Sequence, residues 1–181
     1  MANWEKSLLD EAVDRLCNAP HWKTRLAGWK EGQVLGFAWH LAVFVEPFLS
    51  YVLDGTKTVE SRFSINRSEP YRRVATRDVL LLKSSGGPII AVAEVIEATF
   101  YQLNREGLDR IRERFGEALR VEDDAFWDDR KASCYASIIR IAHVTPIEPL
   151  DCEKRDKRGW VRLHYQPNLF SEEATEHSGT E

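Results

Sequence analysis

The sequence contains little cysteine and no long hydrophobic run, and each shortage excludes a class of protein. Its three cysteines, Cys17, Cys134 and Cys152, are far apart and form no CxxC or Cys/His pattern of the kind that binds zinc. We therefore expect no disulfide framework, no metal and no cofactor. The longest apolar stretch, residues 34–45, is interrupted by His40 and is too short to span a bilayer. Because the first residues also lack the apolar core of a signal peptide, we predict a cytoplasmic protein with reduced thiols and no membrane partner.

The net charge is small, −4 for 181 residues, and its distribution is more informative than its total. Residues 171–181 hold four Glu and no Lys or Arg, so the rest of the chain is electrically neutral. Basic residues gather there in two clusters: Arg62, Arg67, Arg72, Arg73 and Arg77, and Lys154, Arg155, Lys157, Arg158 and Arg162. A local basic face attracts phosphate whatever the overall pI. Each cluster is either such a face or a solvated surface neutralised by nearby acids, and the charge pattern leaves both interpretations open.

Apolar periodicity divides the chain into an extension, a domain and a tail. Behind Asn3, a good N-cap, apolar residues recur at helical spacing until Pro20. This pattern predicts a helix and makes residues 1–38 a helical N-terminal extension. Residues 39–163 are predicted to form the main domain, and residues 164–181 an acidic, disordered tail.

The pattern within the main domain predicts a mixed fold. Helices are expected from Pro47 to Gly55, at 103–119 and at 122–130, and strands at residues 39–45, 58–62, 79–83, 89–99, 135–145 and 160–163. Pro146 is expected to end the fifth strand. Since strands and helices do not alternate regularly, a doubly wound sheet is disfavoured. We predict an α+β fold, a small β-barrel or strongly curved sheet with helices at its ends.

Residues 53–62, LDGTKTVESR, concentrate charge at the junction between a helix and a strand. Thr58, Glu60 and Arg62 should share one face of that strand. A lysine can hold a phosphate, or act as a base if burial lowers its pKa; an arginine offers a planar fork for phosphate; a glutamate can accept a hydrogen bond from a base amino group. The competing interpretation is a surface ion pair of Lys57 or Arg62 with Glu60, which would contribute about 0–1 kcal/mol and have no function.

The same segment resembles the signature of the ASCH domain family. In that signature a helix is followed by G-x-K-x-x-E-x-R, which this chain matches at Gly55, Lys57, Glu60 and Arg62. Further resemblances follow in the family's order: RDVLLL at residues 77–82, AVAEV at 91–95, YASII at 135–139 and RGW at 158–160. The likeness covers residues 39–163.

This resemblance implies a PUA-like β-barrel and a role connected with RNA. Lys57 and Arg62 would hold a phosphate or nucleotide oxygen in a cleft, and Glu60 would meet a base or activate a hydroxyl. A basic rim would guide single-stranded RNA or a nucleotide to them: Arg67, Arg72, Arg73, Lys154, Arg155 and Arg158. The candidates to stack on a base, although core packing is the commoner role of such rings, are Trp39, Tyr135 and Trp160.

Three functions are compatible with these observations. ASCH proteins include ribonucleases, so the first is RNA binding, with or without ribonuclease activity. The second is hydrolysis of an acylated nucleoside such as N4-acetylcytidine, the reaction of one bacterial member type that uses Lys, Thr and Glu. Lys57 matches that lysine, but Glu60 stands at the threonine position, and the hydroxyls of Thr58 and Ser61 are close in sequence but offset from it. For the third group, a Glu after the hairpin, Glu117 is the candidate. The third is a non-catalytic module that binds a protein partner through residues 1–38.

Overall fold

The computed structural model describes residues 3–152 and 158–165. Two helices, α1 (Asn3–Leu16) and α2 (Pro20–Arg25), precede the first strand. The remaining elements are, in chain order, β1 (Ala38–Phe44), α3 (Phe48–Leu53), β2 (Val59–Ser64), β3 (Val79–Ser84), β4 (Ile89–Gln102), α4 (Arg105–Leu119), α5 (Asp124–Asp128), β5 (Tyr135–Leu150) and β6 (Trp160–Tyr165). Among these described residues, no helix has the length and apolar character needed to cross a membrane.

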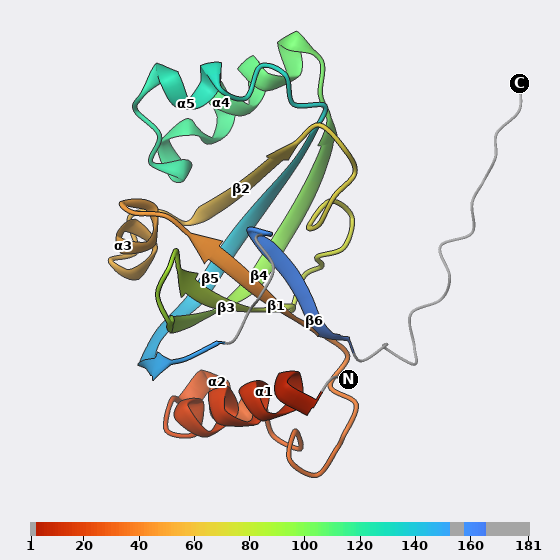
Figure 1. The fold of residues 1–181 in the computed structure, drawn as a ribbon, viewed down its shortest axis with the longest axis vertical. Coiled ribbons are helices and arrows are strands. Elements are labelled where there is room, and N and C mark those ends of the chain that lie inside the picture. Colours follow the sequence, from red (N-terminus) through yellow and green to blue (C-terminus); the bar gives the residue numbers. More distant parts are fainter. Residues whose placement is uncertain (1–2, 153–157, 166–181) are drawn as a thin grey trace, which may run out of the picture.

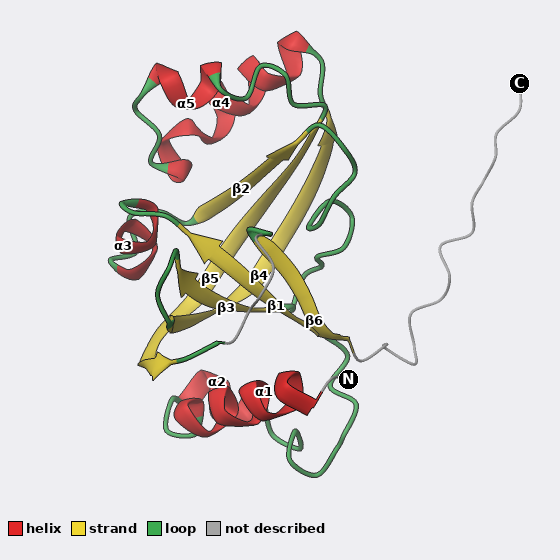
Figure 2. Ribbon diagram, viewed as in Figure 1, coloured by secondary structure: helices red, strands yellow, loops and turns green. Residues whose placement is uncertain are grey.

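The six strands form one mixed sheet in the order β2-β5-β4-β3-β1-β6. Neighbouring strands are antiparallel except β1 and β3, which pair in parallel. The sheet curls into a half-barrel, with α1 and α2 at one end and α4 and α5 at the other (Figures 1 and 2). This arrangement confirms the predicted α+β class and the strongly curved sheet.

Three apolar clusters hold the helices on the sheet. In the first, Leu16 of α1 and Trp22 of α2 pack with Trp39 of β1. The second joins α3, through Val52, to the middle strands. The third packs α4 and α5 against β2 and β5 and includes Val59. Val59 is buried beneath α4. Because side chains alternate along a strand, Glu60 and Arg62 point to the opposite face of β2.

Strand β5 continues past Pro146, where the sequence pattern predicts its end; that prediction was wrong. Pro146 pairs with Ala91 of β4, and Leu150 still pairs with Ile89. On its other side, β5 pairs with β2 only as far as Arg140. After Arg140, no described strand pairs with the side of β5 that faces away from β4. A proline can therefore occupy this edge without removing a ladder hydrogen bond.

A buried hydrogen-bond chain links β6 to the centre of the sheet. Trp160 Nε1 donates to His40 Nδ1 at 3.1 Å, and His40 Nε2 lies 2.9 Å from Asp78 Oδ2. Because Nδ1 accepts, Nε2 is the nitrogen that donates to Asp78. All three side chains are buried, so His40 and Trp160 are parts of the core.

Candidate functional site

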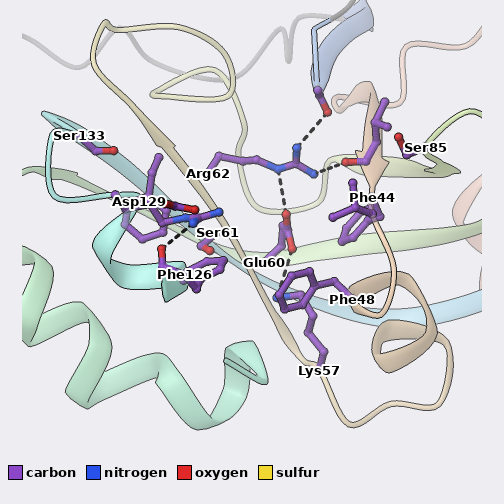
Figure 3. A pocket seen from close by; sticks show the side chains of 15 residues that line it. Phe44, Phe48, Lys57, Glu60, Ser61, Arg62, Ser85, Phe126, Asp129 and Ser133 are labelled. Carbon is purple, nitrogen blue, oxygen red and sulfur yellow. Dashed lines mark hydrogen bonds and ion pairs between the residues drawn. The ribbon is translucent and has the colours of Figure 1, made fainter. Parts of the chain in front are cut away.

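A pocket of about 640 Å³ lies between β2, β1, α3 and α5, and we call it the central pocket. Lys57, Glu60 and Arg62 all line it, so the fold brings the three residues of the predicted motif to one cavity. Figure 3 shows the Glu60 carboxylate between the two cations, with Phe48 and Phe126 in the walls around them. The motif is therefore neither scattered nor a set of surface ion pairs.

A tight turn after α3 sends Lys57 into the interior. The helix ends at Leu53 with Asp54 as its C-cap, and Gly55 follows with φ of 78°, in the left-handed region that glycine adopts at little cost. The backbone N–H and the hydroxyl of Thr56 both donate to Asp54 Oδ1, which fixes the turn. As a result the side chain of Lys57 is only 3% exposed.

Each proton of the Lys57 ammonium has an acceptor within reach. Nζ lies 2.7 Å from Val59 O, 3.2 Å from Leu119 O and 3.3 Å from Glu60 Oε2. An ammonium has three donors, so none remains for a ligand. Burial lowers the pKa of Lys57, and the charge and hydrogen bond of the Glu60 carboxylate oppose that shift. Lys57 thus ties β2 to the end of α4 and positions Glu60.

Arg62 bridges the two edges of the half-barrel. Its Nη2 donates to Val43 O of β1 at 2.8 Å, and its Nη1 donates to Gly159 O, just before β6, at 3.1 Å. Its Nε lies 2.9 Å from Glu60 Oε1. Two of the five N–H donors of the guanidinium therefore make hydrogen bonds within the fold, and Nε faces the Glu60 carboxylate as an ion pair. The two other Nη protons are left for a ligand. Each Glu60 oxygen can likewise accept one further hydrogen bond.

The aromatic wall of the central pocket comes from residues outside the motif. Phe126 of α5 lies under the guanidinium of Arg130, whose Cζ is 3.3 Å from the ring centre and whose Nη1 donates to Phe126 O. Phe48 and Phe63 meet Phe126 edge to face, with ring centres 5.9 and 6.3 Å away. The rings of Phe48, Phe63 and Phe126 are half-buried. Such rings around a polar pocket can stack on a planar ligand.

A second hollow, of about 620 Å³, collects much of the predicted basic rim. We call it the arginine groove, after the four arginines that line it: Arg67, Arg73, Arg158 and Arg162. Glu69 also lines it, and its Oε2 accepts the backbone N–H of Arg162 at 3.2 Å. The groove therefore carries four positive charges against one negative charge.

A third, smaller hollow of about 230 Å³ joins the other two. It shares Arg62, Phe63 and Gly159 with the central pocket. It shares Glu69 and Trp160, among other residues, with the arginine groove. The three hollows therefore adjoin along one face of the molecule.

Several predicted site residues lie away from these hollows. Thr58 and Glu117 are exposed and line none of the three, so the fold does not bring their side chains into the central pocket. Arg72 is exposed as well, with its guanidinium over the ring of Tyr71. Two further candidates lie outside the described residues: Lys154 and Arg155.

The three aromatic candidates are mostly in the core. Trp160 borders the arginine groove, but it is 3% exposed and its N–H is bonded to His40, so it offers no open ring face. Trp39 is fully buried. Tyr135 is half-buried, with its ring centre 4.9 Å from that of Tyr71.

The sequence carries only a faint signal for the aromatic wall. The pattern at residues 122–130 predicts the short helix around Phe126 and Trp127, but not its partner surface. In the structure Trp127 enters the core beside β2, whereas Phe126 borders the pocket. Two adjacent aromatics on a short helix cannot share one face, and this is the one feature that could have indicated an exposed ring.

Comparison with known proteins identifies the fold. No protein-family model matches the sequence, and no curated protein is significantly similar to it. The crystal structure of ASCH from Zymomonas mobilis superposes with a TM-score of 0.56 at 14% identity, over 70% of this chain and 87% of that one. A mutant of the Zymomonas mobilis protein gives a TM-score of 0.54 at 15% identity, over 70% of this chain and 90% of the mutant chain. The resemblance seen in the sequence is confirmed at the level of architecture: the chain has an ASCH-like, PUA-like fold.

Proposed function

We propose that the protein binds single-stranded RNA, with one base in the central pocket and the neighbouring backbone along the arginine groove. The observation that carries this proposal is that the two hollows adjoin: both are lined by Gly159, and the third hollow, which includes Arg62, joins them. A nucleotide needs an apolar surface for its base and positive charge for its phosphate. The hollows offer these two surfaces side by side.

The aromatic wall supports a single-stranded rather than a duplex ligand. A base inside a duplex is already stacked and presents only its edges in the grooves. Sequence-specific RNA recognition therefore relies on splayed bases that stack on aromatic rings or Arg guanidinium planes. Phe126 and Arg130 form such a surface, and Glu60 offers acceptors for a base amino group.

The geometry favours binding over hydrolysis. Lys57 has no donor left for a substrate, and Arg62 spends most of its donors on backbone carbonyls and Glu60. Ser61, Ser85 and Ser133 bring hydroxyls to the pocket, but none of them forms a side-chain hydrogen bond with another described residue. A hydroxyl nucleophile needs an adjacent base to activate it. We therefore expect neither RNA cleavage nor deacetylation of N4-acetylcytidine, and incubation with each substrate tests this.

Binding is measured by fluorescence anisotropy of a labelled octaribonucleotide over a range of KCl concentrations. Replacing Arg67 and Arg73 together by Gln removes two phosphate contacts. The slope of log K against log salt should therefore fall by about 1.4 for a single strand. The matched control is Arg110→Gln, an exposed arginine on α4 that lines none of the hollows.

Two results contradict the proposal. One is wild-type protein that does not bind the octamer at low salt. The other is a double variant whose affinity and salt slope equal those of Arg110→Gln. A duplex of the same sequence should bind more weakly than the single strand, because its bases cannot reach the aromatic wall.

A further inference from the structure

We propose that His21, Glu94 and His143 form a binding site for one divalent transition-metal ion, at the seam between α2 and the sheet. One ligand atom from each lies within 4.8 Å of the ligand atoms of the other two. The residues come from α2, β4 and β5, which only the fold brings together. The site is separate from the hollows proposed to bind RNA, and the inference does not depend on that function.

The three donor atoms are close enough for one metal ion, provided that one histidine ring reorients. His21 Nε2 lies 2.8 Å from Glu94 Oε2, and the rings of His21 and His143 are stacked with centres 3.7 Å apart and 12° between their planes. A tetrahedral zinc ion with ligands at about 2.0–2.2 Å keeps its donor atoms about 3.3 Å apart. The His21–Glu94 pair must open by a few tenths of an ångström. The His143 ring must also turn out of the stack, because two nearly parallel imidazoles cannot direct their in-plane nitrogen lone pairs at one ion; the exposed position of His143 leaves room for this rotation.

The backbone of β5 directs His143 to this place. The pairing of β4 with β5 shifts between Val92 and Glu94. Val92 pairs with Thr145 and Glu94 with Ala142, so a step of two residues on β4 corresponds to a step of three on β5. His143 lies in this β-bulge with φ of 52°, the left-handed region that a side chain rarely adopts. Bulges re-aim side chains and are common beside functional sites. The strained residue is therefore the one whose side chain completes the triad.

The surroundings suit a carboxylate ligand. Glu94 is largely buried, and its other oxygen, Oε1, lies 3.4 Å from Nε of Arg25. Partners of this kind orient a ligating carboxylate and leave its second oxygen for the metal. Two imidazoles and one carboxylate are a ligand set for zinc, cobalt, nickel or copper, with a further position open to water.

The site would also attach α2 to the sheet. Its ligands join residue 21 of the N-terminal helices to β4 and β5, where the apolar contacts of Trp22 already hold α2. Metal binding to the folded protein alone raises its stability by mass action. The melting temperature should therefore rise with zinc concentration, and the increase should depend on the same three residues.

The test uses full-length protein stripped with chelator, titrated with Zn²⁺ in a calorimeter and with Co²⁺ in a spectrophotometer. We expect one site per chain, a cobalt spectrum without a thiolate charge-transfer band, and zinc-dependent stabilisation. His143→Asn is the informative variant, because Asn tolerates the left-handed backbone while removing a ligand. It should weaken zinc binding at least tenfold and abolish most of the thermal shift. His177→Asn, a substitution outside the described residues, is the matched control.

Either of two results overturns the proposal. The first is no stoichiometric binding by the wild-type protein at about 100 μM zinc. The second is binding that His143→Asn leaves unchanged and that the triple Cys17→Ser, Cys134→Ser, Cys152→Ser variant abolishes. The latter would assign the metal to thiols.

Discussion

Replacing Lys57 by Met tests whether this residue serves the fold rather than the ligand. Met keeps the length and most of the apolar stem but removes the ammonium. The carbonyls of Val59 and Leu119 then lose a donor, and Glu60 loses one of its two ion-pair partners and keeps Arg62. All of this takes place in a site where the Lys57 side chain is 3% exposed.

The expected cost follows from burial. Removing one member of a buried, hydrogen-bonded ion pair typically costs about 3–5 kcal/mol when the remaining charge is left uncompensated. Arg62 still faces Glu60 here and reduces this part of the cost. Each buried carbonyl that loses its donor can add to this, by about 1–3 kcal/mol when no other partner replaces it. We expect Lys57→Met to reduce the free energy of unfolding by about 3–5 kcal/mol.

Lys131 provides a matched control. It also pairs with an acid three positions away, Asp128 at 2.7 Å, but both side chains are more than 60% exposed. Exposed pairs contribute about 0–1 kcal/mol, so Lys131→Met should change stability by no more than that. Urea denaturation followed by tryptophan fluorescence measures both variants. Equal, small losses would refute the assignment of Lys57 as a buried anchor, and so would a stable Lys57→Met protein that no longer binds RNA.

Three further outcomes follow from the same contacts. Gly159→Ala should reduce the unfolding free energy by about 1–2 kcal/mol, because a Cβ there would lie 3.0 Å from Nη1 of Arg62 and displace the hydrogen bond of Nη1 to the Gly159 carbonyl. An unchanged unfolding free energy in urea denaturation would show that Arg62 does not bridge the two edges of the sheet. Phe126→Ala should weaken binding of the octaribonucleotide by about 1–3 kcal/mol in anisotropy titrations, the usual range for one stacked base, and unchanged affinity in a folded variant would place the base elsewhere. Burial lowers the pKa of Lys57 in the folded state, so the unfolded chain binds that proton more tightly. The unfolding free energy of the wild type, relative to that of Lys57→Met, should therefore rise as the pH increases from the lowered pKa towards about 10.4. A decrease of this free-energy difference over the same pH range would contradict the direction of the shift.

Local signals in the sequence predicted the elements and the position of the motif. Gly55 marked the end of α3, and the Gly-rich turn before Pro88 marked the β3–β4 hairpin. Pro146 misled because a proline ends a strand only where its missing N–H is needed. Whether β5 has a neighbour on that side depends on the length of β2, which is a tertiary property.

The contacts of the site could not be predicted in the same way. The acceptors of Lys57 and Arg62 include main-chain carbonyls of Leu119, Val43 and Gly159, and a carbonyl carries no side-chain signature. The motif therefore predicted a cluster of charge but not that most of its donors serve the fold. The His21–Glu94–His143 group was missed for a related reason, since its members are not close in sequence and meet only when α2 packs on a bulged strand.

Photo-crosslinking tests the central claim most directly. An octaribonucleotide with one 4-thiouridine is irradiated with the full-length protein, and the modified residues are identified by mass spectrometry. Binding of a base in the central pocket predicts crosslinks at Phe63 or at Phe48 and Phe126, the two rings labelled in Figure 3. These crosslinks should be lost when unlabelled single-stranded RNA competes. Crosslinks confined to other surfaces, such as α1 or the exposed face of α4, would contradict the account.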